Sequence, residues 1–160
     1  GASYLAANLA IVFSQLGERT LLIDADLRHP RQHTLFNLGH RPGLSDMLAG
    51  RANASAVTRL PNLLNLSVLT AGTVPPNPAE LLSRAETPHK LGDFAEQYDV
   101  ILIDTSAAES SADAIMVAAR TQGTLLVLRQ DRSQLATAAS FKAHLNSAGA
   151  NLVGTVLNEY

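Results

Sequence analysis

The chain has 160 residues, of which 46% are apolar and 16% are charged, so it carries enough apolar material for a folded core. A formal net charge of -2 and an aromatic content of 4% argue against a basic stripe or a stacking platform for nucleic acid. The absence of cysteine excludes disulfide scaffolds, thiolate zinc sites and cysteine nucleophiles. The apolar runs have the length of strands, so we expect no direct insertion into a membrane.

Apolar runs of strand length alternate with segments of helical spacing. Leu5, Leu9 and Leu16 share one side of a predicted first helix, which Gly17 ends. Helices are predicted over 5–16, 77–82, 91–98, 112–120 and 133–148. Strands are predicted over 20–23, 66–69, 100–103, 123–128 and 152–157. The remaining stretch, 27–65, is expected to form a partly helical excursion beyond the strand ends.

The predicted strands are apolar on both faces, as in parallel strands that are covered by helices. Strands that alternate with helices in this way are typical of an α/β fold. We therefore predict a mostly parallel sheet with helices on both faces. We expect residues 1–160 to form a single domain, with ligands bound at the carboxyl ends of the strands.

A proline-rich segment precedes the predicted helix at 77–82. Asn77 is a good N-cap, Pro78 suits the first helical position, and Glu80 places an acid in the first turn. Pro75 and Pro76 are therefore expected to form a rigid turn that leads into this helix. The alternative is a polyproline II motif that a partner recognises.

Three aspartates follow two of the apolar strands. Asp24 and Asp26 are separated by one residue, so both carboxylates can face one spot in an extended chain. Asp104 ends another strand and can reach the same spot if the two strands are near neighbours. Such oxygen ligands suit Mg²⁺, although each acid on its own could simply end a strand or cap a helix.

The chain begins with Gly1-Ala2-Ser3-Tyr4, which leads directly into the first predicted helix. A P-loop ends in Gly-Lys-Ser/Thr at such a place, and its backbone N–H groups cradle phosphate. If Gly1 is the last P-loop glycine, Ser3 supplies the hydroxyl that binds Mg²⁺ and Ala2 replaces the lysine. An ordinary helix cap is the alternative.

Five segments together resemble the bacterial tyrosine kinases of exopolysaccharide export, in particular the chain-length-determinant kinases of the EpsG type. The Walker A′-like and Walker B-like segments are also similar to those of ParA/MinD-type P-loop ATPases, whereas the Gly-Leu-Ser and Pro-Pro-Asn-Pro segments narrow the resemblance to the kinases. The similar segments cover nearly the whole chain and are 16–30 (Walker A′), 43–50, 69–83, 98–105 (Walker B) and 154–158.

The resemblance implies an ATP/ADP site that uses Mg²⁺. Ser3, Asp26 and Asp104 would hold the metal ion. Asp24 would be the base that orients or deprotonates the tyrosine hydroxyl. Asn158 would contact the adenine, and the nucleotide-binding residues would be Gly1, Ala2, Ser3, Tyr4 and Asn158.

The resemblance further implies a P-loop-type kinase that transfers the ATP γ-phosphoryl group to tyrosine hydroxyls, its own included, and so regulates polysaccharide chain length and export. Its partner would be a transmembrane polysaccharide co-polymerase, which would hold it at the inner face of the cell membrane, and it could form a homo-oligomer. The family's first strand and P-loop front are expected upstream of Gly1. Of the tyrosine-rich tail, only Tyr160 is present.

Two other functions fit the same segments. One is a ParA/MinD-type ATPase switch that hydrolyses ATP without phosphorylating protein. The other is a catalytically impaired, nucleotide-sensing scaffold subunit of the co-polymerase, which the alanine at the lysine position, Ala2, favours.

Overall fold

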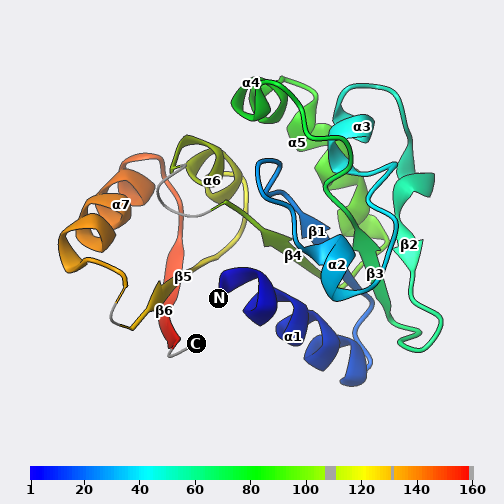
Figure 1. Ribbon diagram of the computed structural model, residues 1–160, viewed down its shortest axis with the longest axis horizontal. Helices are drawn as coiled ribbons and strands as arrows, with labels where there is room; N and C mark the ends of the chain where they lie inside the picture. Colours follow the sequence, from blue (N-terminus) through cyan, green and yellow to red (C-terminus); the bar gives the residue numbers. More distant parts are fainter. Residues whose placement is uncertain (107–110, 131, 159–160) are drawn as a thin grey trace. The chain divides into compact units, whose positions relative to one another are not determined.

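The computed structural model describes residues 1–106, 111–130 and 132–158 (Figure 1). The chain divides into two compact units, a larger one over 3–105 and a smaller one that combines residues 1–2 with 106–160. The predicted α/β architecture with mostly parallel strand pairing is confirmed. The single domain over 1–160 stays a prediction.

The larger unit contains a four-stranded sheet with the order β2-β3-β1-β4. The central strand β1 pairs in parallel with β3 and β4, and the short edge strand β2 is antiparallel to β3. The sequence did not predict β2, whose two residues are both exposed. The elements of this unit are α1 (Ala2–Gln15), β1 (Thr20–Asp24), α2 (Gln32–Leu35), α3 (Leu44–Leu48), η1 (Ala54–Ala56), β2 (Thr58–Arg59), β3 (Leu66–Leu69), α4 (Pro78–Ser83), α5 (Thr87–Gly92), η2 (Asp93–Glu96) and β4 (Val100–Asp104).

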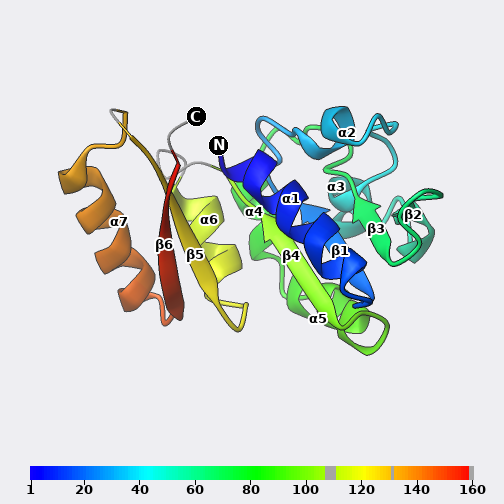
Figure 2. The ribbon, with the colours of Figure 1, turned by 90° about the horizontal axis from the view of Figure 1, so that it is seen from below.

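Both faces of this sheet are covered by helices, with α1 on one side and α4 and α5 on the other (Figures 1 and 2). Ala7 and Ala10 of α1 pack into a core with Leu22 and Val68. The helix was predicted correctly, but its apolar side was wrong in part, because Leu16 is 72% exposed. The small side chains of the two alanines let the helix approach the strands closely.

The excursion over 27–65 returns to the sheet at its carboxyl edge. The N–H of Leu44 donates to the carbonyl of Thr70 at 2.7 Å, so α3 docks onto the loop that follows β3. Gly43 is packed so tightly there that a Cβ would overlap the backbone of Gly72. The Gly-Leu-Ser segment of the sequence therefore serves a close backbone contact.

The predicted helix at 77–82 begins as expected, since the side chain of Asn77 accepts a hydrogen bond from the N–H of Glu80 at 3.4 Å. The helix predicted over 91–98 is different. α5 starts earlier, at Thr87, and the chain then tightens into the 3₁₀ helix η2 around buried Phe94. This ring contacts Tyr98 edge-on, and the contact anchors the turn that leads into β4.

The smaller unit contains a two-stranded parallel sheet, β5-β6, with two helices. Its core is formed by Ala114, Phe141 and Leu145. Within the described ranges, no helix combines the length and the apolar character that crossing a membrane requires. The elements of this unit are α6 (Ser111–Ala118), β5 (Thr124–Arg129), α7 (Leu135–Ser147) and β6 (Leu152–Asn158).

Candidate active site

Asp24 ends the central strand β1 and is completely buried. Its Oδ2 accepts hydrogen bonds from the N–H groups of Arg31 at 3.0 Å and Gln32 at 2.9 Å, and its Oδ1 accepts one from Asp26 at 3.2 Å. Burial raises the pKa of Asp24 to about 6, and the nearby charge of Asp104 adds to this effect, while the three N–H donors oppose it. The carboxyl group is thus poised to change its protonation near neutral pH.

Asp104 ends β4 directly beside Asp24, because the two residues are register partners in the parallel pair. Burial raises the pKa of Asp104, and the charge of Asp26 adds to the rise, whereas hydrogen bonds from Gln32 and Ser3 lower it. The sheet therefore brings the predicted Ser3 and Asp104 into contact at the start of α1. Two buried carboxylates side by side need positive charge nearby to be ionised together.

Asp26 is half-buried and shapes the turn after β1. Its Oδ1 accepts hydrogen bonds from the N–H groups of Arg28 at 3.2 Å and His29 at 3.0 Å. Over the described part of the chain, no three His, Cys, Asp or Glu side chains are arranged to hold a metal ion. The predicted set of one hydroxyl and two carboxylates, Ser3, Asp26 and Asp104, stays a prediction.

Gln32 is a site residue that the sequence did not reveal. Its side chain is completely buried, and its Nε2 donates to Asp104 Oδ2 and to the carbonyl of Ser3, both at 2.9 Å. Its Oε1 is buried without a hydrogen-bond partner. Gln32 lies in the predicted excursion, where its sequence looks like that of a surface segment. Only the fold shows that this amide closes the carboxylate site.

The predicted phosphate-binding residues lie at the start of α1. Helix α1 begins at Ala2, so Ser3 and Tyr4 are in its first turn and Gly1 precedes it. The Tyr4 side chain is 64% exposed. Gly1 and Ala2 group with the smaller unit, and a phosphate-binding role for these residues stays a prediction.

Asn158, the predicted adenine-contacting residue, ends β6 in the smaller unit. It is the register partner of Arg129, and its carbonyl accepts a hydrogen bond from the N–H of Gln130 at 2.9 Å. Its role toward a nucleotide stays a prediction. Tyr160, the tyrosine that remains of the tail segment, lies outside the described residues.

Two curated relatives align with almost the whole chain. The CapB protein of Staphylococcus aureus, named as a tyrosine-protein kinase, is 35% identical over 159 residues, which are 99% of this chain and 70% of that protein. Tyrosine-protein kinase YwqD of Bacillus subtilis (strain 168) is 37% identical over 158 residues, 99% of this chain and 67% of that protein. This chain belongs to the bacterial tyrosine-protein kinases. The family resemblance predicted from the sequence is thereby confirmed.

Longer members of the bacterial tyrosine-protein kinases contain a similar segment. The chain is 33% identical to tyrosine-protein kinase wzc of Salmonella typhi and spans 22% of that protein and 99% of itself. No protein-family model matches the chain.

Solved structures give the same assignment. The chimerical protein CapA2B2 superposes with a TM-score of 0.92 at 31% identity, over 99% of this chain and 70% of that one. The septum site-determining protein MinD of Pyrococcus horikoshii OT3, described as complexed with Mg-ADP, superposes with a TM-score of 0.80 at 24% identity, over 100% of this chain and 65% of that one. This second likeness shows a fold that the tyrosine kinases share with MinD.

Proposed function

We propose that this bacterial tyrosine-protein kinase transfers the γ-phosphoryl group of ATP to tyrosine hydroxyl groups. The observation that carries the proposal is the buried pair of Asp24 and Asp104 at the carboxyl edge of the sheet, in a chain of this family. Phosphoryl transfer needs positioned groups and electrostatic stabilisation more than covalent chemistry from the protein. The edge of the sheet offers such positioned groups.

The residues at this edge fit Mg²⁺. Asp104 is a buried carboxylate, Ser3 is in contact with it, and Gln32, whose Nε2 donates to Asp104, has a buried amide oxygen without a partner. These are hard oxygen donors, the kind that Mg²⁺ prefers. In the proposed site Ser3, Asp26 and Asp104 hold the ion, which when bound neutralises phosphate charge. Backbone N–H groups at the start of α1 would face the phosphates.

Asp24 is proposed as the group that receives the tyrosine proton. A pKa of about 6 leaves its carboxylate mostly ionised at pH 7 and still able to hold a proton. Its Oδ1 accepts one hydrogen bond from within the chain, and a carboxylate oxygen can accept a second one. In the overall transfer, tyrosine and ATP give phosphotyrosine, ADP and a proton, and this proton passes through Asp24.

The proposed setting follows from the names of the relatives. The CapA2B2 chimera superposes on the whole chain, and the kinase CapB is similar in sequence. We propose that the chain works beside a transmembrane co-polymerase at the inner face of the membrane and so acts on exopolysaccharide chain length. Self-assembly of the chain belongs to the same proposal.

The metal part of the proposal is tested by Asp104→Asn in calorimetric titrations with ATP, with and without Mg²⁺. We expect the affinity for Mg-ATP to fall by about 10-fold or more, since a charge-assisted contact is worth about 1.5–3 kcal/mol. Metal-free ATP should lose much less. Asp99→Asn, at the residue directly before the same strand, is the matched control. Equal losses with and without Mg²⁺ would show that Asp104 only supports the fold.

The phosphotransfer step is tested by Asp24→Asn, with phosphotyrosine measured by mass spectrometry on tyrosine peptides. Transfer should fall by about 100-fold, within the usual range for general-base catalysis. Binding of Mg-ATP should be retained within a few-fold. Unchanged transfer would remove Asp24 as the proton acceptor, and ATP turnover without any phosphotyrosine would favour a MinD-type switch.

One observation favours the second candidate, a nucleotide-sensing scaffold subunit. Ala2 stands where the P-loop has lysine, so this chain lacks one cation that contacts the phosphates. Ala2→Lys should tighten Mg-ATP by about 10- to 100-fold and raise transfer. If this variant gains affinity and still transfers no phosphate, the scaffold function is supported.

A further inference from the structure

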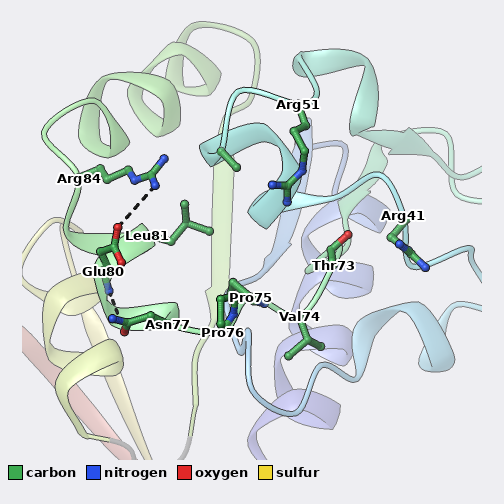
Figure 3. A pocket seen from close by; sticks show the side chains of 11 residues that line it. Arg41, Arg51, Thr73, Val74, Pro75, Pro76, Asn77, Glu80, Leu81 and Arg84 are labelled. Carbon is green, nitrogen blue, oxygen red and sulfur yellow. Dashed lines mark hydrogen bonds and ion pairs between the residues drawn. The ribbon is translucent and has the colours of Figure 1, made fainter.

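A pocket of about 420 Å³ opens in the larger unit beside the loop that follows β3 (Figure 3). Its lining includes three arginines, Arg41, Arg51 and Arg84, against one acid, Glu80. The lining residues carry a positive excess of two, which the pairing of Arg51 with Asp46 reduces to one, around a space of the size that holds small ligands. The pocket shares no lining residue with the Asp24–Asp104 pair, although both are at the carboxyl edge of the same sheet.

Two of these arginines have donors to spare. Arg51 Nη2 donates to Asp46 Oδ1 at 3.2 Å, which fixes its side chain while its other N–H groups can still donate. Arg84 Nη2 is 3.6 Å from Glu80 Oε1, a loose and exposed pair with little net energy. Figure 3 shows Arg51 and Arg84 extending into the pocket from two different sides. Each of the two guanidinium groups can donate further hydrogen bonds to an anion that is bound in the pocket.

The opposite wall of the pocket is apolar and rigid. Val74, Pro75 and Pro76 run along it, and Leu81 of α4 faces them (Figure 3). Val74 is 56% exposed, so its side chain is accessible to a ligand. Prolines lose little entropy when a flat ring packs on them, because their backbone is already restrained. The pocket thus combines a surface for a ring with a site for an anion.

We propose that this pocket binds the side chain of phosphorylated tyrosine. The ring packs on Val74, Pro75 and Pro76, and the phosphate accepts hydrogen bonds from Arg51 and Arg84. This inference rests on the proposed function, because the kinase reaction is the source of such a group. A carboxylate side chain carries less charge, and phosphoserine lacks the ring that the apolar wall fits. The pocket would retain phosphorylated segments next to the site that makes them.

The inference is tested by titrating the chain with N-acetyl-phosphotyrosine amide, followed by calorimetry or by NMR shifts. Arg84→Gln should weaken binding by about 10-fold, as expected for one contact to a charged group. Arg51→Lys keeps the charge beside Asp46 and loses the forked geometry, so it should weaken binding by several-fold. Arg59→Gln removes an equal charge on β2, outside the pocket, and should leave binding unchanged.

Three outcomes would overturn the inference: equal binding of the phosphoserine and phosphotyrosine amides, tighter binding of ATP by the same arginines, and an unchanged affinity in Arg84→Gln. Arg84 is exposed, so its replacement leaves the fold intact, and a melting curve checks this. The titration contains no ATP. If the chain binds phosphotyrosine but transfers no phosphate, only the proposed kinase function is contradicted. If the chain transfers phosphate but does not bind phosphotyrosine, only the proposed role of the pocket is contradicted.

Discussion

Asp24 and Asp46 are both buried in the larger unit and both accept several hydrogen bonds, yet their carboxyl groups behave in opposite ways. Burial raises the pKa of Asp24 to about 6. At Asp46 burial also acts to raise the pKa, but hydrogen bonds from Thr73, Gly43 and Arg51 outweigh it, so the pKa is lowered. The surroundings of the two carboxylates therefore differ, although both are buried at the same edge of the sheet.

The difference lies in the groups that face each acid. Asp46 receives a hydroxyl and an N–H from Thr73, at 2.9 and 3.2 Å, and a guanidinium from Arg51. Within the described part of the larger unit, Asp24 accepts hydrogen bonds only from uncharged N–H groups, and a second carboxylate, Asp104, lies beside it. A carboxylate with its own cation is a structural element, whereas a crowded pair of acids is suited to a bound cation.

The largest expected effect on stability is at Asp46, whose carboxylate accepts several hydrogen bonds. Asp46→Ala should lower the free energy of unfolding by about 3–5 kcal/mol, because it leaves the N–H groups of Gly43 and Thr73 and the Thr73 hydroxyl without their acceptor. Arg51 is largely exposed and adds little to this loss. Urea denaturation measures this change. Asp93→Ala, at an exposed acid, is the control and should change stability by less than about 1 kcal/mol. A small loss for Asp46→Ala would mean that the contacts around the Gly-Leu-Ser segment are dispensable.

The next effect is the pH dependence at the crowded pair. Because the folded pKa of Asp24 is about 6, against about 3.9 for a free aspartate, its contribution to stability is fully present below pH 4 and is lost as the pH rises through 6. Compared with Asp24→Asn, the wild-type chain should lose about 2 kcal/mol between pH 4 and pH 7, out of a full effect of about 3 kcal/mol at about 1.4 kcal/mol per pKa unit. Denaturation curves of both proteins at several pH values measure the difference.

Asp46 should show the opposite sign. Its pKa is lowered on folding, so its contribution to stability is present above its unfolded pKa and is lost as the pH falls below it. Plots of unfolding free energy against pH should therefore converge at low pH for the wild type and Asp46→Asn. At neutral pH the wild type and Asp24→Asn should have the same stability only if a bound cation stabilises the Asp24 carboxylate. If the stability of both variants has the same pH dependence as that of the wild type, the two acids do not differ in the way proposed.

The smallest effect is expected at Gln32. Gln32→Leu removes the hydrogen bond to Asp104 but also removes a buried amide oxygen without a partner, so stability should change by no more than about 1 kcal/mol. The affinity for Mg-ATP should fall by several-fold, since Asp104 loses the group that orients it. Gln32→Glu is the informative partner variant, because a third acid should make the fold depend on Mg²⁺. If Mg²⁺ does not change the free energy of unfolding of Gln32→Glu, Gln32 does not lie beside the proposed metal site.

The sequence was sufficient where local chemistry decides the structure. Apolar runs of strand length predicted β1, β3, β4, β5 and β6. β1 and β3 are buried throughout, as expected of strands that are covered on both faces, whereas alternate residues of β6 are exposed. Asn77 and Pro78 predicted the start of α4 for the same local reason. The family resemblance and the pair of acids at strand ends also came from residue order alone.

Tertiary structure decided which residues that are far apart in the chain contact one another. The exposed Leu16 and the buried Ala10 show that the sheet, and not apolar spacing, selects the inner face of α1. Gln32 reaches Asp104 across 72 positions, and its pattern in sequence is that of any polar loop residue. The sequence by itself determined the parallel strands, the family and the acids. Only the packing of distant segments decided which acid has a cation, because hydrogen bonds and burial depend on neighbours that the order of residues does not specify.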